Sequence, residues 1–153
     1  MSSKTVAIIG AGRVGGSIGY LLARAGLTVT AVATRSMTTA ERARDFIGCG
    51  SATTDIVEAA STADIVFITT PDGVIKAVCD AIASGGGFRP GALVVHTSGA
   101  HSTGLLDAAK AAGALRAVIH PLQSVPSMER GIGNIPGSAA RVEADRGAER
   151  TVR

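Results

Sequence analysis

Three glycines near the start of the chain have the spacing of a phosphate-binding loop. Gly10, Gly12 and Gly15 follow the apolar run Val6–Ile9 in the pattern G-x-G-x-x-G. The first glycine of this pattern permits a tight turn after a strand, the second lets the backbone approach a pyrophosphate, and the third lets the next helix pack closely. The N-terminus of that helix offers free N–H groups and the positive end of its dipole. The predicted dinucleotide site consists of Gly10, Ala11, Gly12, Arg13, Val14 and Gly15.

The segments on either side of the glycines supply the context that this motif needs. Thr5–Ile9 is β-branched and apolar, which is typical of a buried parallel strand. Apolar residues then recur at helical spacing from Val14 to Ala25, and Gly26 stands where a helix would end. A second β-rich run covers Leu27–Thr34, which completes one βαβ unit. The alternative interpretation is a glycine-rich turn without a ligand.

The residues after the second strand indicate which dinucleotide binds. An NAD site usually places an Asp or Glu about 20 residues after the glycines, where it accepts hydrogen bonds from the ribose 2′-OH. Here no acidic residue precedes Glu41, and the strand ends in Thr34, Arg35 and Ser36. Arg35 can pair with a 2′-phosphate, the two hydroxyls can donate to it, and Arg13 adds positive charge nearby. The sequence favours NADP over NAD, unless Arg35 is only a solvated loop residue.

Two further loops follow predicted strands, where ligands bind in open α/β sheets. The loop after the central strand offers Thr70, Pro71 and Asp72 to the cofactor, although Asp72 could simply cap the next helix. The second loop, Thr97–Ala100, contains Ser98, a candidate for contact with nicotinamide or substrate. The alternative for Ser98 is an ordinary Ser-Gly turn.

His120 is the main candidate for proton transfer. It ends the last long predicted strand, and Pro121 fixes the backbone after it. Because imidazole titrates near neutral pH, a histidine there could exchange a proton with a substrate carbonyl or amine during hydride transfer. The alternative is that His120 anchors its loop by hydrogen bonds. His96, inside a strand, and His101, near a helix start, are predicted to be structural.

Composition argues against several other classes of protein. Hydrophobic residues make up 46% and aromatic residues 3%, so the core must consist of small aliphatic side chains, as suits helices packed on a parallel sheet. The net charge of +3 comes without clustered basic and aromatic residues, which disfavours a nucleic-acid partner. Cys49 and Cys79 lack metal-ligand spacing, and their number suggests a reducing compartment.

No other targeting or catalytic motif stands out. The chain has no charged-then-apolar leader and no apolar run of about 18 residues, so we expect a cytoplasmic protein without a membrane partner. The G-x-S-x-G and G-x-x-x-x-G-K-[ST] motifs of hydrolases and P-loop kinases are absent. We predict no metal site.

The remaining pattern alternates strands with helices, which predicts an α/β fold with a doubly wound, mostly parallel Rossmann sheet and helices on both faces. The expected helices after the first cover Thr39–Phe46, Asp55–Ala60, the segment around Ile75–Ile82 and Ser102–Ala112. The expected strands after the second are a short edge strand in Gly48–Thr54, then Asp64–Thr70, Ala92–His96, Leu115–Ile119 and Ala139–Glu143. Thr38–Glu41 has capping-box spacing at the start of the second helix.

The end of the chain differs in composition from the rest. We expect an NADP-binding domain over residues 1–145. Residues 146–153 are rich in charge and poor in apolar side chains, so we expect this tail to fray at a domain boundary.

The motifs together resemble a known family. The family is that of the Rossmann-like, NADP-binding proteins that carry a C-terminal DUF2520 domain, and the resemblance covers roughly residues 4–145. The motifs that carry it are I-I-G-A-G-R-V-G, A-T-R-S, T-T-P-D, V-V-H-T-S-G-A and I-H-P-L-Q-S. That family is similar in its N-terminal domain to pyrroline-5-carboxylate reductase, prephenate dehydrogenase and the F420-dependent NADP oxidoreductases. The resemblance implies phosphate binding by Gly10–Gly15, 2′-phosphate binding by Thr34, Arg35 and Ser36, and a cofactor- or substrate-facing role for Ser98 and His120.

The resemblance also implies a helical C-terminal domain, which in these relatives forms a homodimer and closes the substrate pocket. We expect this chain to lack that domain. The leading hypothesis is therefore the NADP-binding domain of an oxidoreductase that transfers a hydride between a nicotinamide cofactor and a small carbonyl, imine or amine substrate. The rival is a non-catalytic nucleotide-binding or sensing module. A third alternative is a Rossmann-type domain that binds another ligand, such as a nucleotide sugar, without redox chemistry.

Overall fold

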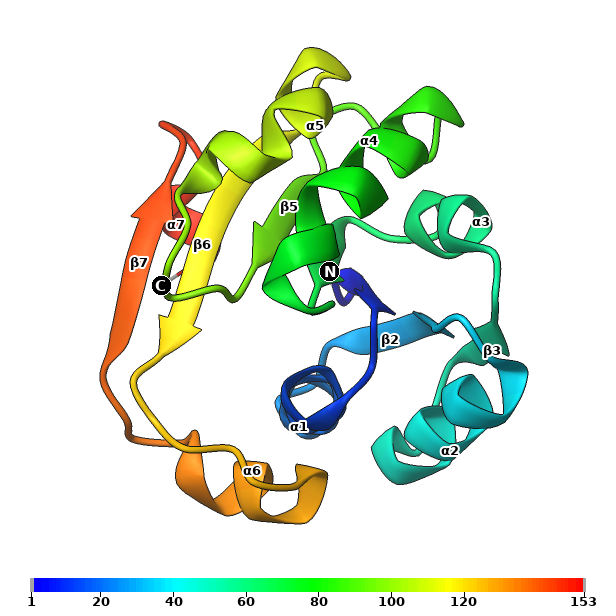
Figure 1. The fold of residues 1–153 in the computed structure, drawn as a ribbon, viewed down its shortest axis with the longest axis vertical. Coiled ribbons are helices and arrows are strands. Elements are labelled where there is room, and N and C mark those ends of the chain that lie inside the picture. Colours follow the sequence, from blue (N-terminus) through cyan, green and yellow to red (C-terminus); the bar gives the residue numbers. More distant parts are fainter. Residues whose placement is uncertain (1, 153) are drawn as a thin grey trace.

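The computed structural model describes residues 2–152, which form a seven-stranded sheet with helices on both faces (Figure 1). The strand order is β3-β2-β1-β4-β5-β6-β7. The strands are β1 (Thr5–Ile9), β2 (Thr28–Ala33), β3 (Ser51–Thr53), β4 (Ile65–Ile68), β5 (Leu93–His96), β6 (Leu115–Pro121) and β7 (Ala140–Ala144). Strands β1 to β6 are parallel, and β7 runs antiparallel to β6. The predicted doubly wound, mostly parallel sheet is confirmed.

Helices connect the strands and pack on the two faces of the sheet. They are α1 (Arg13–Arg24), α2 (Met37–Ile47), α3 (Ile56–Ser61), α4 (Ile75–Ser84), α5 (Asp107–Ala111), α6 (Met128–Asn134) and α7 (Glu149–Val152), with 3-10 turns η1 (Asp72–Val74) and η2 (Thr103–Leu106). Within residues 2–152, no helix has the length and apolarity needed to cross a bilayer.

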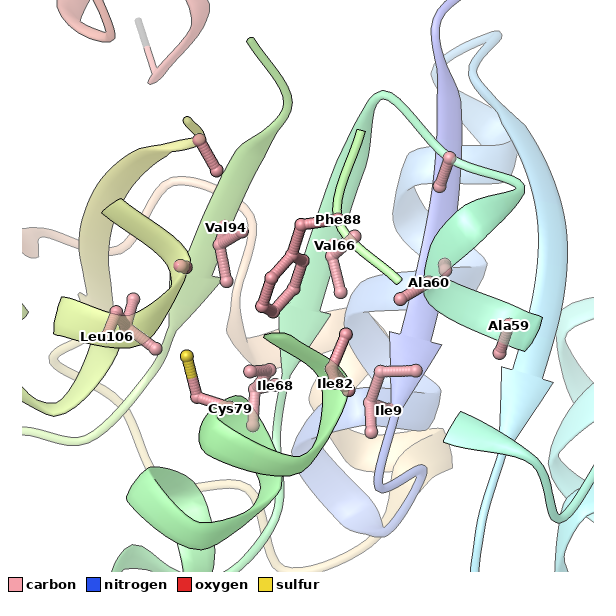
Figure 2. Close-up of a cluster of buried hydrophobic side chains, with 14 of the residues drawn as sticks. Ile9, Ala59, Ala60, Val66, Ile68, Cys79, Ile82, Phe88, Val94 and Leu106 are labelled. Atoms are coloured by element: carbon pink, nitrogen blue, oxygen red, sulfur yellow. The ribbon is translucent and has the colours of Figure 1, made fainter. Parts of the chain in front are cut away.

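Two apolar clusters form the core, one on each face of the sheet. Successive strand residues point to opposite faces, so Ile9 joins one cluster and Ile8 the other. Figure 2 shows the first cluster, in which Cys79 and Ile82 of α4 and Leu106 of η2 meet the strands. The second cluster packs α1, α2 and α6 against the opposite face. The small side chains that the composition demanded let these helices lie close to the sheet.

The ends of the first two helices test the local sequence signals. Gly26 follows the end of α1 with φ of +95°, as predicted for a glycine at that position. The predicted start of the second helix is wrong, because α2 begins at Met37 and Ser36 caps it by accepting a hydrogen bond from the Thr39 N–H. Ser36 precedes Thr39 by the three residues that an N-cap requires, so it competes successfully with Thr38.

Three other segments also differ from expectation. The helix predicted over Ser102–Ala112 is a 3-10 turn followed by the short helix α5. Strand β6 continues to Pro121, so His120 lies within it. The tail expected to fray folds back instead, because Ala148 is fully buried and Val152 packs against the same cluster.

Helix α6 is an element that the sequence pattern did not reveal. Its two glycines make it a weak helix former. It is held by packing on α1, where a Cβ on Gly16 would lie 2.8 Å from Cγ of Met128. The buried Ser17 hydroxyl lies 2.9 Å from the Met128 carbonyl, to which it can donate, and Gly131 leaves room for Ser17. This packing places the segment after β6 beside the glycine loop.

Candidate functional site

The glycine loop packs tightly against the neighbouring strand end. Gly10 has φ of +84°, and a Cβ there would lie 2.6 Å from Cγ2 of Thr70. A Cβ on Gly15 would overlap Oγ1 of Thr69 and lie 2.7 Å from the Gly10 carbonyl oxygen. These contacts explain the first and third glycines: one makes the turn, and the other lets α1 approach the end of β4.

Gly12 has a different environment from the other two glycines. Among the described residues, no atom lies within 4 Å of the position that its Cβ would occupy. Within residues 2–152, no side chain caps the N-terminus of α1, and no acidic residue occupies the first turn of this helix. The helix thus presents backbone N–H groups and a positive dipole end to open space. An anion such as a pyrophosphate fits this place, formed by the Gly10–Gly15 loop and the first turn of α1, which we call the cradle.

The residues expected at the 2′-phosphate lie beside the glycine loop. The Gly10 N–H donates to the Ala33 carbonyl at 2.8 Å, which joins the loop to the end of β2. Immediately after Ala33, the Thr34 hydroxyl donates to the Ser36 carbonyl at 2.6 Å, while Ser36 caps α2. Arg35 between them is exposed. The structure therefore gathers Thr34, Arg35 and Ser36 at a second helix N-terminus beside the cradle.

Thr70 carries an unusual polar atom. Its Oγ1 is buried and has no hydrogen-bond partner among residues 2–152. Thr70 also packs on Gly10 through its Cγ2 methyl and its backbone, so the residue lies beside the glycine loop. A buried hydroxyl without a partner costs stability, and a ligand acceptor would relieve that cost.

Ser98 is held inside its loop. It is 4% exposed, and its hydroxyl donates to the Asp72 carboxylate at 2.8 Å. The same oxygen accepts a hydrogen bond from the Ala100 N–H at 3.2 Å. Asp72 therefore braces Ser98, whereas the N-cap of η1 is Pro71 without a side-chain bond. The alternative reading of Asp72 as a helix cap is wrong.

His96 has the structural role expected for it. Its Nδ1 accepts a hydrogen bond from the Ser98 N–H at 3.1 Å, so the proton resides on Nε2, which donates to the Ser102 carbonyl at 2.7 Å. Burial lowers the pKa of His96, which favours this neutral form. Both ring nitrogens are satisfied, and the ring fixes the turn that contains Ser98.

His120 is placed differently. Its Nδ1 lies 2.9 Å from the Thr97 carbonyl oxygen, which can only accept, so Nδ1 donates. The neutral ring then carries a lone pair on Nε2, on the edge that faces Gly99, where a Cβ would lie 2.6 Å away. The hydrogen bond to Thr97 matches the loop-anchoring alternative, and it also fixes Nε2 as the nitrogen left to exchange a proton.

A hollow of about 360 Å³ connects His120 with the glycine loop. Arg13 and Val14 line it from the start of α1, Thr97 and His120 line it from the ends of β5 and β6, and Pro121 and residues 123–126 complete it. Ser98 and Asp72 are not among the residues that line it. The structure thus brings His120 and the cradle to one hollow and places Ser98 behind it, as a support for the loop.

Two residues of β7 support this loop and were not anticipated. Arg141 donates to the His101 carbonyl at 2.7 Å and to the Ser98 carbonyl at 3.3 Å. Glu143 accepts from the N–H and hydroxyl of Thr103 at 2.9 and 2.8 Å, and these bonds lower the pKa of its carboxyl. The one sequence signal that could have suggested this role for Arg141 and Glu143 is that opposite charges alternate along the last predicted strand.

No metal site accompanies these features. Within residues 2–152, no group of three or more His, Cys, Asp and Glu side chains is arranged to hold a metal ion.

Fold and site together define a doubly wound α/β domain with an uncapped helix N-terminus at its first βα turn. The chain matches the Rossmann-like domain family over residues 2–121 and belongs to that family. No curated protein matches it significantly.

Solved structures share the fold over nearly the whole chain. A Bacteroides fragilis protein assigned as an NADP oxidoreductase has a TM-score of 0.80 at 21% identity, and the match covers 97% of this chain and 54% of the Bacteroides protein. Pyrroline-5-carboxylate reductase of Coxiella burnetii has a TM-score of 0.75 at 20% identity, and the match covers 99% of this chain and 54% of the reductase. Prephenate dehydrogenase of Aquifex aeolicus, in complex with hydroxyphenyl propionate and NAD+, has a TM-score of 0.74 at 19% identity, and the match covers 99% of this chain and 56% of the dehydrogenase. This chain spans about half the length of these neighbours.

Proposed function

We infer that the chain is the NADP-binding domain of an oxidoreductase that transfers a hydride between the nicotinamide cofactor and a small carbonyl, imine or amine substrate. The observation that carries this proposal is the uncapped N-terminus of α1 beneath the open Gly12 position, next to the partnerless Thr70 hydroxyl. Structural neighbours with reductase and dehydrogenase names support it.

Each part of the proposed cofactor site has a physical task. The N–H groups at the start of α1 would bind the pyrophosphate, and Thr70 would donate its free hydroxyl to the cofactor. Arg35 would pair with the 2′-phosphate at the N-terminus of α2, where the helix dipole also favours negative charge. A carboxylate, which would repel that phosphate, is absent from residues 34–36. These features favour NADP.

His120 would handle the proton. The nicotinamide cofactor, when bound, supplies or accepts the hydride. His120 shares the hollow with the cradle, and Thr97 holds its Nδ1, so Nε2 would give a proton to the substrate heteroatom or take it away. Ser98 would act through the loop that it braces, since its hydroxyl already donates to Asp72.

The finer assignments follow from the family resemblance. The motifs around Gly10, Ser98 and His120 favour the DUF2520-containing oxidoreductases and a C-terminal partner domain that closes the hollow. In that arrangement the 153 residues would bind the cofactor, and turnover would need the second domain.

A non-catalytic nucleotide-binding module is the second candidate. The loop-anchoring bond of His120 and the engaged hydroxyl of Ser98 favour it, because both are explained without a substrate. Two measurements test the candidates, and the second separates them. Titration of the chain with NADPH, followed by fluorescence, should saturate for either candidate, and failure to bind would contradict both. With a C-terminal domain supplied, exchange of the nicotinamide hydrogen label with imine or carbonyl compounds supports the enzyme, and binding without exchange supports the module.

A further inference from the structure

We propose that a second copy of this chain pairs with the free edge of β7, in a symmetric dimer whose two-fold axis passes through Val142. In the described part of the chain, β7 has β6 on one side and no strand on the other (Figure 1). The opposite edge of the sheet is β3, which has three residues, whereas β7 has five. Short edge strands resist pairing with other chains, so β7 is the edge that offers a template.

The hydrogen bonds between β6 and β7 define which backbone N–H and C=O groups of β7 remain free. The Asp145 N–H donates to the Arg116 carbonyl, and the Leu122 N–H donates to the Ala139 carbonyl. In an antiparallel ladder these bonds alternate along each strand, so Arg141 and Glu143 direct their N–H and C=O groups toward β6. Ala140, Val142 and Ala144 direct theirs toward the free edge.

The side chains of β7 select one register for a second copy. An antiparallel pair centred on Val142 places Ala140 opposite Ala144 of the second copy and Arg141 opposite its Glu143. Arg141 and Glu143 then occupy non-hydrogen-bonded positions, where facing side chains approach most closely. Opposite charges therefore meet twice across the axis. A shift of two residues in one direction sets Glu143 opposite Glu143 of the second copy, and a shift in the other direction sets Arg141 opposite Arg141, so both place like charges at the axis.

The other face of β7 supplies an apolar surface at the same axis. Val142 is 49% exposed, which is unusual for a valine within a strand. It borders a hollow of about 330 Å³ that Ala144, Val152 and the charged residue Glu149 also line. Pairing at Val142 would bring the two valines together and cover this surface. A proline within an edge strand hinders pairing with another chain, and β7 contains no proline.

Sedimentation equilibrium of the purified 153-residue chain tests the proposal. The contact is small, so we expect the average mass to rise from monomer toward dimer between about 1 and 200 µM. Val142→Pro removes an N–H that faces the free edge and leaves the bonds to β6 intact, so it should keep the chain monomeric. Val142→Thr retains the N–H and the β-branched shape and should still associate. A wild-type chain that stays monomeric throughout would overturn the proposal.

Disulfide cross-linking tests the axis itself, without relying on a proline variant that folds. In a Cys49→Ser background, Val142→Cys would oppose its own copy at a hydrogen-bonded position, where Cα atoms are about 5.5 Å apart and a disulfide fits. Ala140→Cys is the matched control, since its own copy would lie about 13 Å away. Burial raises the pKa of the Cys79 thiol to about 11, so it should not interfere. Dimer formation by Val142→Cys alone supports the axis, and equal cross-linking or none contradicts it.

Discussion

Arg116 and Asp145 form a bidentate, mostly buried ion pair that ties the end of β7 to β6. The guanidinium donates to both carboxylate oxygens at 3.0 and 2.8 Å, and the Arg116 N–H donates to the same carboxylate at 2.9 Å. Arg116 is 12% exposed and Asp145 is 17% exposed. Arg116 also reaches Asp107 and the Thr103 carbonyl, so this pair connects the tail to the segment after the Ser98 loop.

The first prediction concerns stability. Asp145→Asn should lower the free energy of unfolding by about 2–3 kcal/mol at neutral pH, because it leaves the Arg116 charge partly uncompensated. Asp107→Asn is the matched control: its carboxylate binds the same guanidinium but is 73% exposed, so the loss should stay below about 1 kcal/mol. Urea unfolding of both variants measures the difference, and equal losses would contradict the importance of the buried pair.

The second prediction concerns pH. Hydrogen bonds from Arg116 lower the pKa of Asp145 below its ordinary value. A carboxylate with a lowered folded-state pKa stabilises the protein fully above its unfolded-state pKa of about 3.9, and this contribution disappears as the pH falls through the folded-state pKa. The wild-type chain should therefore lose more stability than Asp145→Asn as the pH is lowered from about 5. Parallel acid-unfolding curves for the two proteins would contradict this.

The third prediction concerns cofactor choice. Arg35→Ser should weaken NADPH binding by roughly tenfold or more, because it removes the charge that pairs with the 2′-phosphate, and should change NADH binding by less than about twofold. Arg24→Ser is the control, since it removes the same charge from the last turn of α1, at the helix end opposite to the cradle. Isothermal titration with both cofactors measures the effect. An unchanged preference for NADPH would refute the role of Arg35.

The fourth prediction concerns the support of His120. Gly99→Ala introduces a Cβ that would lie 2.6 Å from Nε2 of His120, so the ring must move away from the loop. We expect a loss of about 1–3 kcal/mol in stability and a clear change in the His120 ring signals in NMR spectra. Gly73→Ala, whose Cβ meets no described atom within 4 Å, should change neither. A silent Gly99→Ala variant would show that the ring is not held there.

Local signals in the sequence predicted most of the fold. Gly26 followed the end of α1 as expected, because this effect depends on a few neighbouring residues. Helix α6 was not predicted, since Gly131 is favourable there only because Ser17 of α1 packs against it. In the site, too, the local motif was predictable from the sequence and the long-range contact was not. The glycine loop was visible in the pattern, but Ser98 became a buried brace through Asp72, which lies 26 residues earlier and meets it only in the folded chain.

The most direct test of the central claim is the binding of NADPH to Gly12→Ala. Its Cβ would meet no described atom of the protein, so thermal stability should be unchanged, while the methyl group would occupy space that the pyrophosphate needs. We predict at least about a tenfold weaker affinity. Gly133→Ala in α6, equally free of contacts, should bind NADPH as the wild type does. If Gly12→Ala binds NADPH with wild-type affinity, the cradle at the start of α1 does not hold the cofactor.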